Sequence, residues 1–193
     1  MRQPLEDGIV TISRVNATLT YPCNFMFISS VNPCPCGHFG SPEKECTCNP
    51  NQISKYMSKI SGPLLDRIDI VIEVTPVKYQ KLEDTTKPEY SKEIRERVNN
   101  ARTIQYERYK EHSIFSNSEL TPSLSDKYCK LDEKGKQILK MAFDKLGLSA
   151  RAYSRILKVA RTIADLSGSH NIESEHIAEA IQYRSLDKKY WRN

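Results

Sequence analysis

Apolar and polar residues alternate along residues 9–20, on both sides of Arg14, Val15 and Asn16. Alternation with a period of two is typical of a strand with one apolar face, and a break between two such runs is typical of a hairpin. The pattern therefore predicts a β-hairpin whose turn lies near Val15.

Two further segments are continuously apolar. Residues 25–31 (FMFISSV) and 69–74 (DIVIEV) are rich in strand formers, and an uninterrupted run of this kind is typical of a strand buried on both faces of a sheet. Between them, residues 53–60 carry apolar side chains at helical spacing. A hairpin and two lone strands would leave unpaired edges and an uncovered apolar face, so we expect further core strands preceding Met1.

The rest of the chain has helical periodicity. Apolar residues recur every three or four positions in four stretches after residue 90. Ser149 and Ser174 each precede such a stretch and are predicted N-caps, and Gly147 is predicted to end the second helix. Four helices with short connections predict a small bundle.

A charged segment with two prolines separates the two kinds of pattern. We therefore predict a core domain over residues 1–75, a connector over 76–90 and a helical domain over 91–193.

The low hydrophobic content of 38% suggests that the core is incomplete. The net charge of +5 suits binding to phosphate or nucleic acid without requiring it. Because no segment resembles a secretory signal or a membrane span, we expect a cytoplasmic protein without a membrane partner.

Four of the six cysteines, Cys34, Cys36, Cys46 and Cys48, fall in one loop. Two pairs of thiolates are sufficient for a tetrahedral Zn²⁺ site, and clustering in a reducing compartment favours metal binding or free thiols over a disulfide framework. The C-x-C spacing is tighter than the usual C-x-x-C. The alternative to a metal site is therefore four reduced thiols, or a disulfide formed on purification. If a metal is bound, His38 is a further candidate ligand.

Five stretches carry a resemblance to a known family: RQPLEDGIVTISR, NPCPCG, SGPLLDRIDI, LSARAYSRILKVARTIADL and EAIQYRSLD. Through them nearly the whole chain resembles the magnesium-chelatase-like AAA+ ATPases of the YifB/ComM competence-protein type. The resemblance implies the class α/β plus α, with the C-terminal remnant of an AAA+ core, containing the hairpin and two buried strands, followed by a helical lid. It also implies a ring, a hexamer, with ATP and Mg²⁺ between neighbouring subunits.

The resemblance implies roles for three polar residues. Arg67, in LLDRID, matches the arginine finger that acts on the ATP of the neighbouring subunit. Asn32 matches the sensor-1 position, which orients the attacking water, and Arg151 matches the sensor-2 arginine of the lid. Each residue also has a plainer interpretation. Arg67 is then an arginine paired with the preceding aspartate, Asn32 a turn residue before proline, and Arg151 a residue on a solvated helix face.

The hairpin resembles the presensor-1 hairpin of ring helicases, which projects into the central pore. Arg14 or Asn16 near its tip is then a candidate contact to nucleic-acid phosphates. Related replicative proteins tend to have a lysine at the tip, whereas this chain has Asn16. A hairpin that only packs against a neighbour is the alternative.

The resemblance therefore implies the C-terminal portion of an ATP-driven DNA motor, a branch-migration helicase acting in recombination and natural transformation. Metal insertion into a porphyrin fits the cysteine loop less well. The sequence contains no G-x-x-x-x-G-K-[ST] motif and no apolar run ending in Asp-Glu, so the chain alone is expected not to hydrolyse ATP. The alternative from another class is a non-catalytic, zinc-stabilised module that binds DNA or a protein.

Overall fold

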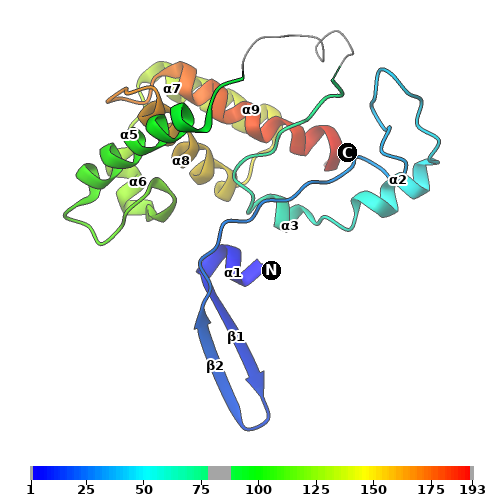
Figure 1. The fold of residues 1–193 in the computed structure, drawn as a ribbon, viewed down its shortest axis with the longest axis horizontal. Coiled ribbons are helices and arrows are strands. Elements are labelled where there is room, and N and C mark those ends of the chain that lie inside the picture. Colours follow the sequence, from blue (N-terminus) through cyan, green and yellow to red (C-terminus); the bar gives the residue numbers. More distant parts are fainter. Residues whose placement is uncertain (1, 78–87, 192–193) are drawn as a thin grey trace. The chain divides into compact units, whose positions relative to one another are not determined.

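The structure of the chain, a computed structural model, describes residues 2–77 and 88–191 (Figure 1). The chain divides into two compact units, Met1–Ile68 with Asp187–Asn193, and Asp69–Leu186. The domains expected from the sequence, 1–75 and 91–193, stay a prediction. Most of the expected connector, residues 78–87, lies outside the described residues.

The first unit contains short elements joined by loops. Its helices and strands are α1 (Arg2–Asp7), β1 (Ile9–Arg14), β2 (Ala17–Pro22), α2 (Pro50–Met57) and α3 (Gly62–Leu65). The two strands pair in antiparallel register, with Arg14 opposite Ala17 across the turn. The predicted hairpin and its turn near Val15 are therefore confirmed.

The hairpin has two chemically different faces. On one face the hydroxyls of Thr11 and Thr20 lie 3.3 Å apart, and those of Ser13 and Thr18 lie 3.2 Å apart. The register places apolar pairs on the other face, Val10 with Tyr21 and Ile12 with Leu19. Ile12 is 45% exposed and Leu19 is 53% exposed, so the apolar face of the hairpin is not covered within the described chain.

The two predicted buried strands are not found. Residues 25–31 and 69–74 belong to no strand of the described chain, and Met26, Ile28 and Val74 are 83 to 84% exposed. A strand is stabilised by pairing with a neighbour. The hairpin is the one sheet among the described residues, and neither segment pairs with it. The two segments do have the apolar pattern of a buried strand, but that pattern does not provide the neighbouring strand with which each would pair.

The second unit is helical. Its elements are α5 (Ser91–Tyr109), the 3₁₀ turn η1 (Asn117–Glu119), α6 (Pro122–Tyr128), α7 (Glu133–Leu146), α8 (Ala150–Leu166) and α9 (Ser174–Trp191), of which α9 continues beyond Leu186. The predicted bundle is confirmed, with η1 and α6 in addition. Thr121 followed by Pro122 is the sequence signal for α6, because the Thr121 hydroxyl accepts from the Leu124 N–H at the helix start.

The predicted helix ends agree with the structure except in one case. Ser149 caps α8 by accepting from the Ala152 N–H at 3.2 Å, and Gly147 follows α7 in the left-handed conformation at φ 59°. Ser174 is the first residue of α9 rather than its cap. The carbonyl of Glu173 accepts the first helical hydrogen bond, from the Ile177 N–H at 3.3 Å.

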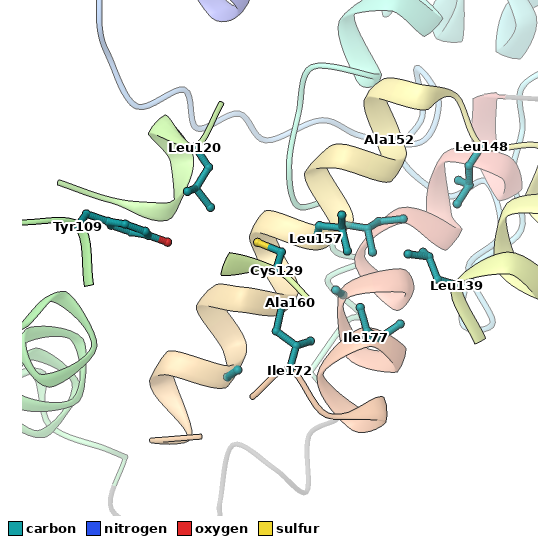
Figure 2. Close-up of a cluster of buried hydrophobic side chains, with 13 residues drawn as sticks. Tyr109, Leu120, Cys129, Leu139, Leu148, Ala152, Leu157, Ala160, Ile172 and Ile177 are labelled. Carbon is teal, nitrogen blue, oxygen red and sulfur yellow. The ribbon is translucent and has the colours of Figure 1, made fainter. Parts of the chain in front are cut away.

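The core of the helical unit lies along α8 (Figure 2). Buried apolar residues recur along one face of this helix: Ala152, Ile156, Leu157, Ala160 and Ala164. Leu139 of α7 and Ile177 of α9 belong to the same cluster, and both are almost fully buried. This periodic face explains why α8 is the central helix of the unit.

A buried carboxylate joins α8 to α5 and η1. The Asp165 side chain is fully buried. Arg108 donates to both Asp165 oxygens, at 2.9 and 2.5 Å, and the Nε of Arg161 donates to one of them at 3.2 Å. The amide of Asn117 donates to Asp165 at 2.8 Å and accepts from the Tyr109 hydroxyl at 2.6 Å. Each charge in this network has an opposite charge beside it, which offsets the cost of its burial.

We predict that Asp165→Asn lowers the free energy of unfolding of the helical unit by about 3 kcal/mol, because it leaves buried Arg161 without its counter-charge. Urea unfolding followed by circular dichroism measures the change. The matched control, Asp144→Asn on the exposed side of α7, is expected to change it by less than about 0.5 kcal/mol. Equal effects of the two substitutions would contradict a central role for Asp165.

Candidate functional site

Arg67 directly follows α3 and its C-cap residue Asp66. The Arg67 side chain is 10% exposed; its Nη1 donates to the Pro63 carbonyl at 2.6 Å and its Nη2 pairs with Glu6 of α1. The Nε of Arg67 is buried and has no hydrogen-bond partner among the described residues. The guanidinium therefore lies opposite a carboxylate, with one donor unsatisfied.

The ion pair of Arg67 joins residues that are far apart in the sequence. Arg67 pairs with Glu6, 61 residues away, and the alternative of a pair with the preceding aspartate stays a prediction. No local pattern could identify that partner, since the pairing depends on how α1 and α3 come together. Glu6 is thus the residue of this region that sequence reasoning missed.

Asn32 is exposed and lies two residues before the first loop cysteine. Its Cγ and Nδ2 atoms are each 4.0 Å from the position that a Cβ on Gly37 would occupy. Gly37 has φ +82°, and its N–H donates to the Cys34 carbonyl at 3.0 Å. The Asn32 amide therefore lies beside the tight turn that carries Cys34 and Cys36, where a residue with positive φ is required.

The four loop cysteines gather as the sequence predicted. The Sγ of Cys34 lies 3.3 Å from that of Cys36 and 3.7 Å from that of Cys46, and Cys36 and Cys46 are 3.6 Å apart. With Cys48, all four sulfurs lie within 4.8 Å of one another, and His38 is not part of this group. Four sulfurs about 2.3 Å from Zn²⁺ form a tetrahedron with edges of about 3.8 Å. The cluster is close to that size.

Within the cluster, one negative charge is favoured and a second is opposed. The His38 N–H donates to Cys36 and, against the effect of burial, lowers the pKa of the Cys36 thiol to about 5. The Cys48 N–H lowers the pKa of the Cys46 thiol, but burial and the neighbouring sulfurs outweigh it and raise that pKa to about 12. Burial also raises the pKa of Cys48. Four thiolates are therefore compatible only with a cation between them.

Arg14 and Asn16 lie at the tip of the hairpin. Arg14 is the last residue of β1, Asn16 is in the turn, and both side chains are exposed. Val15 between them is fully exposed, with no neighbouring side chain covering it. The tip is therefore accessible to a partner and carries one positive charge.

Arg151 is exposed in the first turn of α8. Two further cations of α8 have partners within the helical unit: Arg155 pairs with Asp69, and Lys158 donates to the Ser118 carbonyl at 2.9 Å. Burial, and then the charge of Arg155, lower the pKa of Lys158. Arg151 is exposed, whereas Arg155 and Lys158 are half-buried.

The described architecture defines a two-part protein, with a hairpin and cysteine loop in one unit and a helical bundle in the other. The family model described as magnesium chelatase, subunit ChlI, matches residues 1–82, and the model of the ChlI C-terminal region matches residues 88–184. The chain therefore belongs to the magnesium chelatase ChlI-like family. Among the residues that the structure describes, every helix is too short or too polar to span a lipid bilayer.

Several bacterial relatives align with almost the whole chain. Competence protein ComM of Haemophilus influenzae is 42% identical over 187 residues, which is 96% of this chain. YifB of Escherichia coli is 37% identical over 189 residues, or 97% of the chain. An uncharacterized protein of Mycobacterium tuberculosis is 30% identical over 184 residues, or 95% of the chain. In each case the aligned region is 36% of the relative, so the chain spans about a third of the length of the curated relatives that it matches.

Proposed function

We propose that the chain is the C-terminal portion of a magnesium-chelatase-like AAA+ ATPase that acts on DNA, as a branch-migration helicase of the ComM type in recombination and natural transformation. The observation that supports this most directly is 42% identity with ComM across 96% of the chain. In this proposal the protein is a cytoplasmic hexameric ring that binds ATP and Mg²⁺ between neighbouring subunits. The phosphate-binding loop comes from sequence outside these 193 residues.

Arg67 is the proposed arginine finger. A guanidinium already placed opposite the Glu6 carboxylate, with its Nε donor unsatisfied, has the charge and the geometry to bind another anion. On the γ-phosphate of a neighbouring subunit it would stabilise the charge that develops during phosphoryl transfer. Glu6 must release Arg67 for this step.

Asn32 and Arg151 are the proposed sensors. An exposed amide on an ordered turn can orient a water molecule by hydrogen bonding. Arg151 lies where the backbone N–H groups at the start of α8 already favour an anion, so a phosphate there meets two positive contributions. Nucleotide binding would in this way be communicated to the helical unit.

The hairpin is the proposed DNA contact. Arg14 supplies a cation and Asn16 a hydrogen-bonding amide at an exposed tip, and phosphate contacts of this kind position a protein on DNA without reading its sequence. Sequence-independent contact is what a translocating motor requires.

A structural Zn²⁺ in the cysteine loop completes the proposal. Cys34, Cys36, Cys46 and Cys48 would each supply one thiolate, and a closed set of four sulfurs leaves no open position for catalysis. Zn²⁺ is therefore assigned to folding of the loop rather than to the ATPase reaction. A reducing cytoplasm keeps these thiols available.

The second candidate function is a zinc-stabilised module that binds DNA or a protein without using nucleotide. The sulfur cluster favours it, because that site is built from this chain's own residues. The two candidates differ in whether Arg67 contributes to ATP hydrolysis.

For the ATPase, we predict that the chain alone does not hydrolyse ATP, and that a chimera in which it replaces the matching 36% of ComM does. Arg67→Ala in the chimera is expected to retain ATP binding and to lower kcat by about 10³-fold, because the finger stabilises only the transition state. Steady-state phosphate release measures this, with Arg102→Ala on the exposed side of α5 as the matched control.

Mixed rings test whether the site is shared. Arg67→Ala subunits mixed with subunits carrying a defective phosphate-binding loop should recover part of the activity, since some interfaces then combine an intact loop with an intact finger. An active chimera insensitive to Arg67→Ala would refute the finger. If the chimera binds DNA but never hydrolyses ATP, the second candidate is favoured.

For the hairpin, we predict that Arg14→Ala weakens binding of the chain to fluorescein-labelled single-stranded DNA and reduces the slope of log K against log salt by about 0.7. Fluorescence anisotropy over a salt series measures both. Lys55→Ala in α2 removes an equal charge from an exposed position of the same unit and should leave the slope unchanged. Equal effects of the two substitutions would indicate nonspecific attraction.

For the metal, we predict about one Zn²⁺ per chain in reduced, chelator-free protein, since four thiolates complete a tetrahedral site. Elemental analysis measures the stoichiometry. Cys46→Ser is expected to abolish binding, whereas Cys23→Ser, outside the cluster, should preserve it. Zinc far below one equivalent in the unsubstituted chain would remove Zn²⁺ from the proposal.

A further inference from the structure

We propose that metal binding by the four cysteines fixes the position of the Asn32 amide, so that the cysteine loop is a positioning element for the candidate sensor. This inference rests on the Zn²⁺ site and the sensor role in the proposed function. It adds a physical connection between them, from the sulfurs through one turn of backbone to Asn32.

The connection is short. Cys34 follows Asn32 by two residues, and the Gly37 N–H closes a turn onto the Cys34 carbonyl at 3.0 Å. The Asn32 amide lies against this turn, 4.0 Å from the Cβ position of Gly37. The Phe39 N–H also donates to the Cys34 sulfur at 3.4 Å. A shift of Cys34 or Cys36 therefore moves the backbone beside which Asn32 lies.

The contacts between the four sulfurs determine whether the turn at Cys34–Gly37 has a fixed position. Cys34 is fully buried, and its Sγ lies 3.7 Å from that of Cys46, which is twelve residues further along the chain. A metal bound by all four sulfurs cross-links the turn to the segment leading into α2. Without a metal, the contacts between Sγ atoms are weak hydrogen bonds, and a second thiolate would repel the first.

Within the described part of the chain, the apolar residues before Asn32 provide no alternative anchor. Met26, Ile28 and Val31 precede Asn32, and their side chains are between 45 and 84% exposed. The chain on the N-terminal side of Asn32 therefore makes little packing that could fix it. The turn on its C-terminal side is what remains to set its position.

The test is NMR of the full chain labelled with ¹⁵N at asparagine, reduced and stripped of metal, during addition of ZnCl₂. Asn32→Asp assigns the Asn32 side-chain amide pair. The NMR signals of this amide pair are expected to shift and sharpen in proportion to bound Zn²⁺ until about one equivalent is bound. The amide of Asn117, buried in the helical unit, should not change and reports that the unit stays folded.

Substitutions separate the metal from its effect. Cys46→Ser should lose both Zn²⁺ and the sharpened Asn32 signal, whereas Cys46→His, which restores a ligand, should recover both. Gly37→Ala and Gly40→Ala impose the same backbone strain, since φ is +82° and +78° at these positions. The first should displace the Asn32 signal of the zinc-loaded chain more than the second, because Gly37 is the residue beside Asn32.

The outcomes are distinct. Zinc bound at one site while the Asn32 pair stays unchanged would overturn this inference and leave the metal site intact. Failure of the unsubstituted chain to bind zinc would refute the metal site itself, and the inference with it. A signal that sharpens with zinc, is lost in Cys46→Ser and returns in Cys46→His would establish the connection.

Discussion

Within residues 2–68, the four gathered sulfurs join the two ends of the cysteine loop in a segment that buries few apolar side chains. The buried apolar side chains described in that range are Cys34, Met57 and Leu65, one of them a member of the cluster. So little apolar burial cannot offset the entropy of ordering a chain of this length. Local hydrogen bonds hold the hairpin, and a metal cross-link would supply to the loop the stability that a core supplies elsewhere.

The helical unit, in contrast, is stabilised by an apolar core of its own. Its apolar cluster along α8 removes enough surface from water for a polar network to be buried inside it. Asp165 is held there by Arg108 and Arg161, so α5 and α8 are joined by charge as well as by packing. Removing one partner is costly because the others lie in the same dry surroundings. Under the proposed function, a rigid helical unit of this kind can transmit a movement at Arg151 without deforming.

Sequence reasoning succeeded where the deciding interaction is local. The hairpin turn, the Ser149 cap, the Gly147 stop and the clustering of the cysteines each involve residues within about one loop or turn of one another. It failed where the interaction is distant. The partner of Arg67 lies 61 residues away and the partner of Arg155 lies 86 residues away. The apolar segments 25–31 and 69–74 indicate strand preference, but a strand requires a partner that periodicity does not provide.

The pairing of Arg67 with Glu6 bears on whether this arginine can act as a finger. Removing the counter-charge of a largely buried ion costs about 3–5 kcal/mol, so Arg67 would be poorly suited to leave Glu6 for water. Exchange of Glu6 for a phosphate avoids that cost, because an anion faces the guanidinium in both states. Glu6 keeps a third of its exposure and can be solvated when released. In the proposed role of Arg67 as a finger, the pair therefore favours movement only when a nucleotide is present to receive the guanidinium.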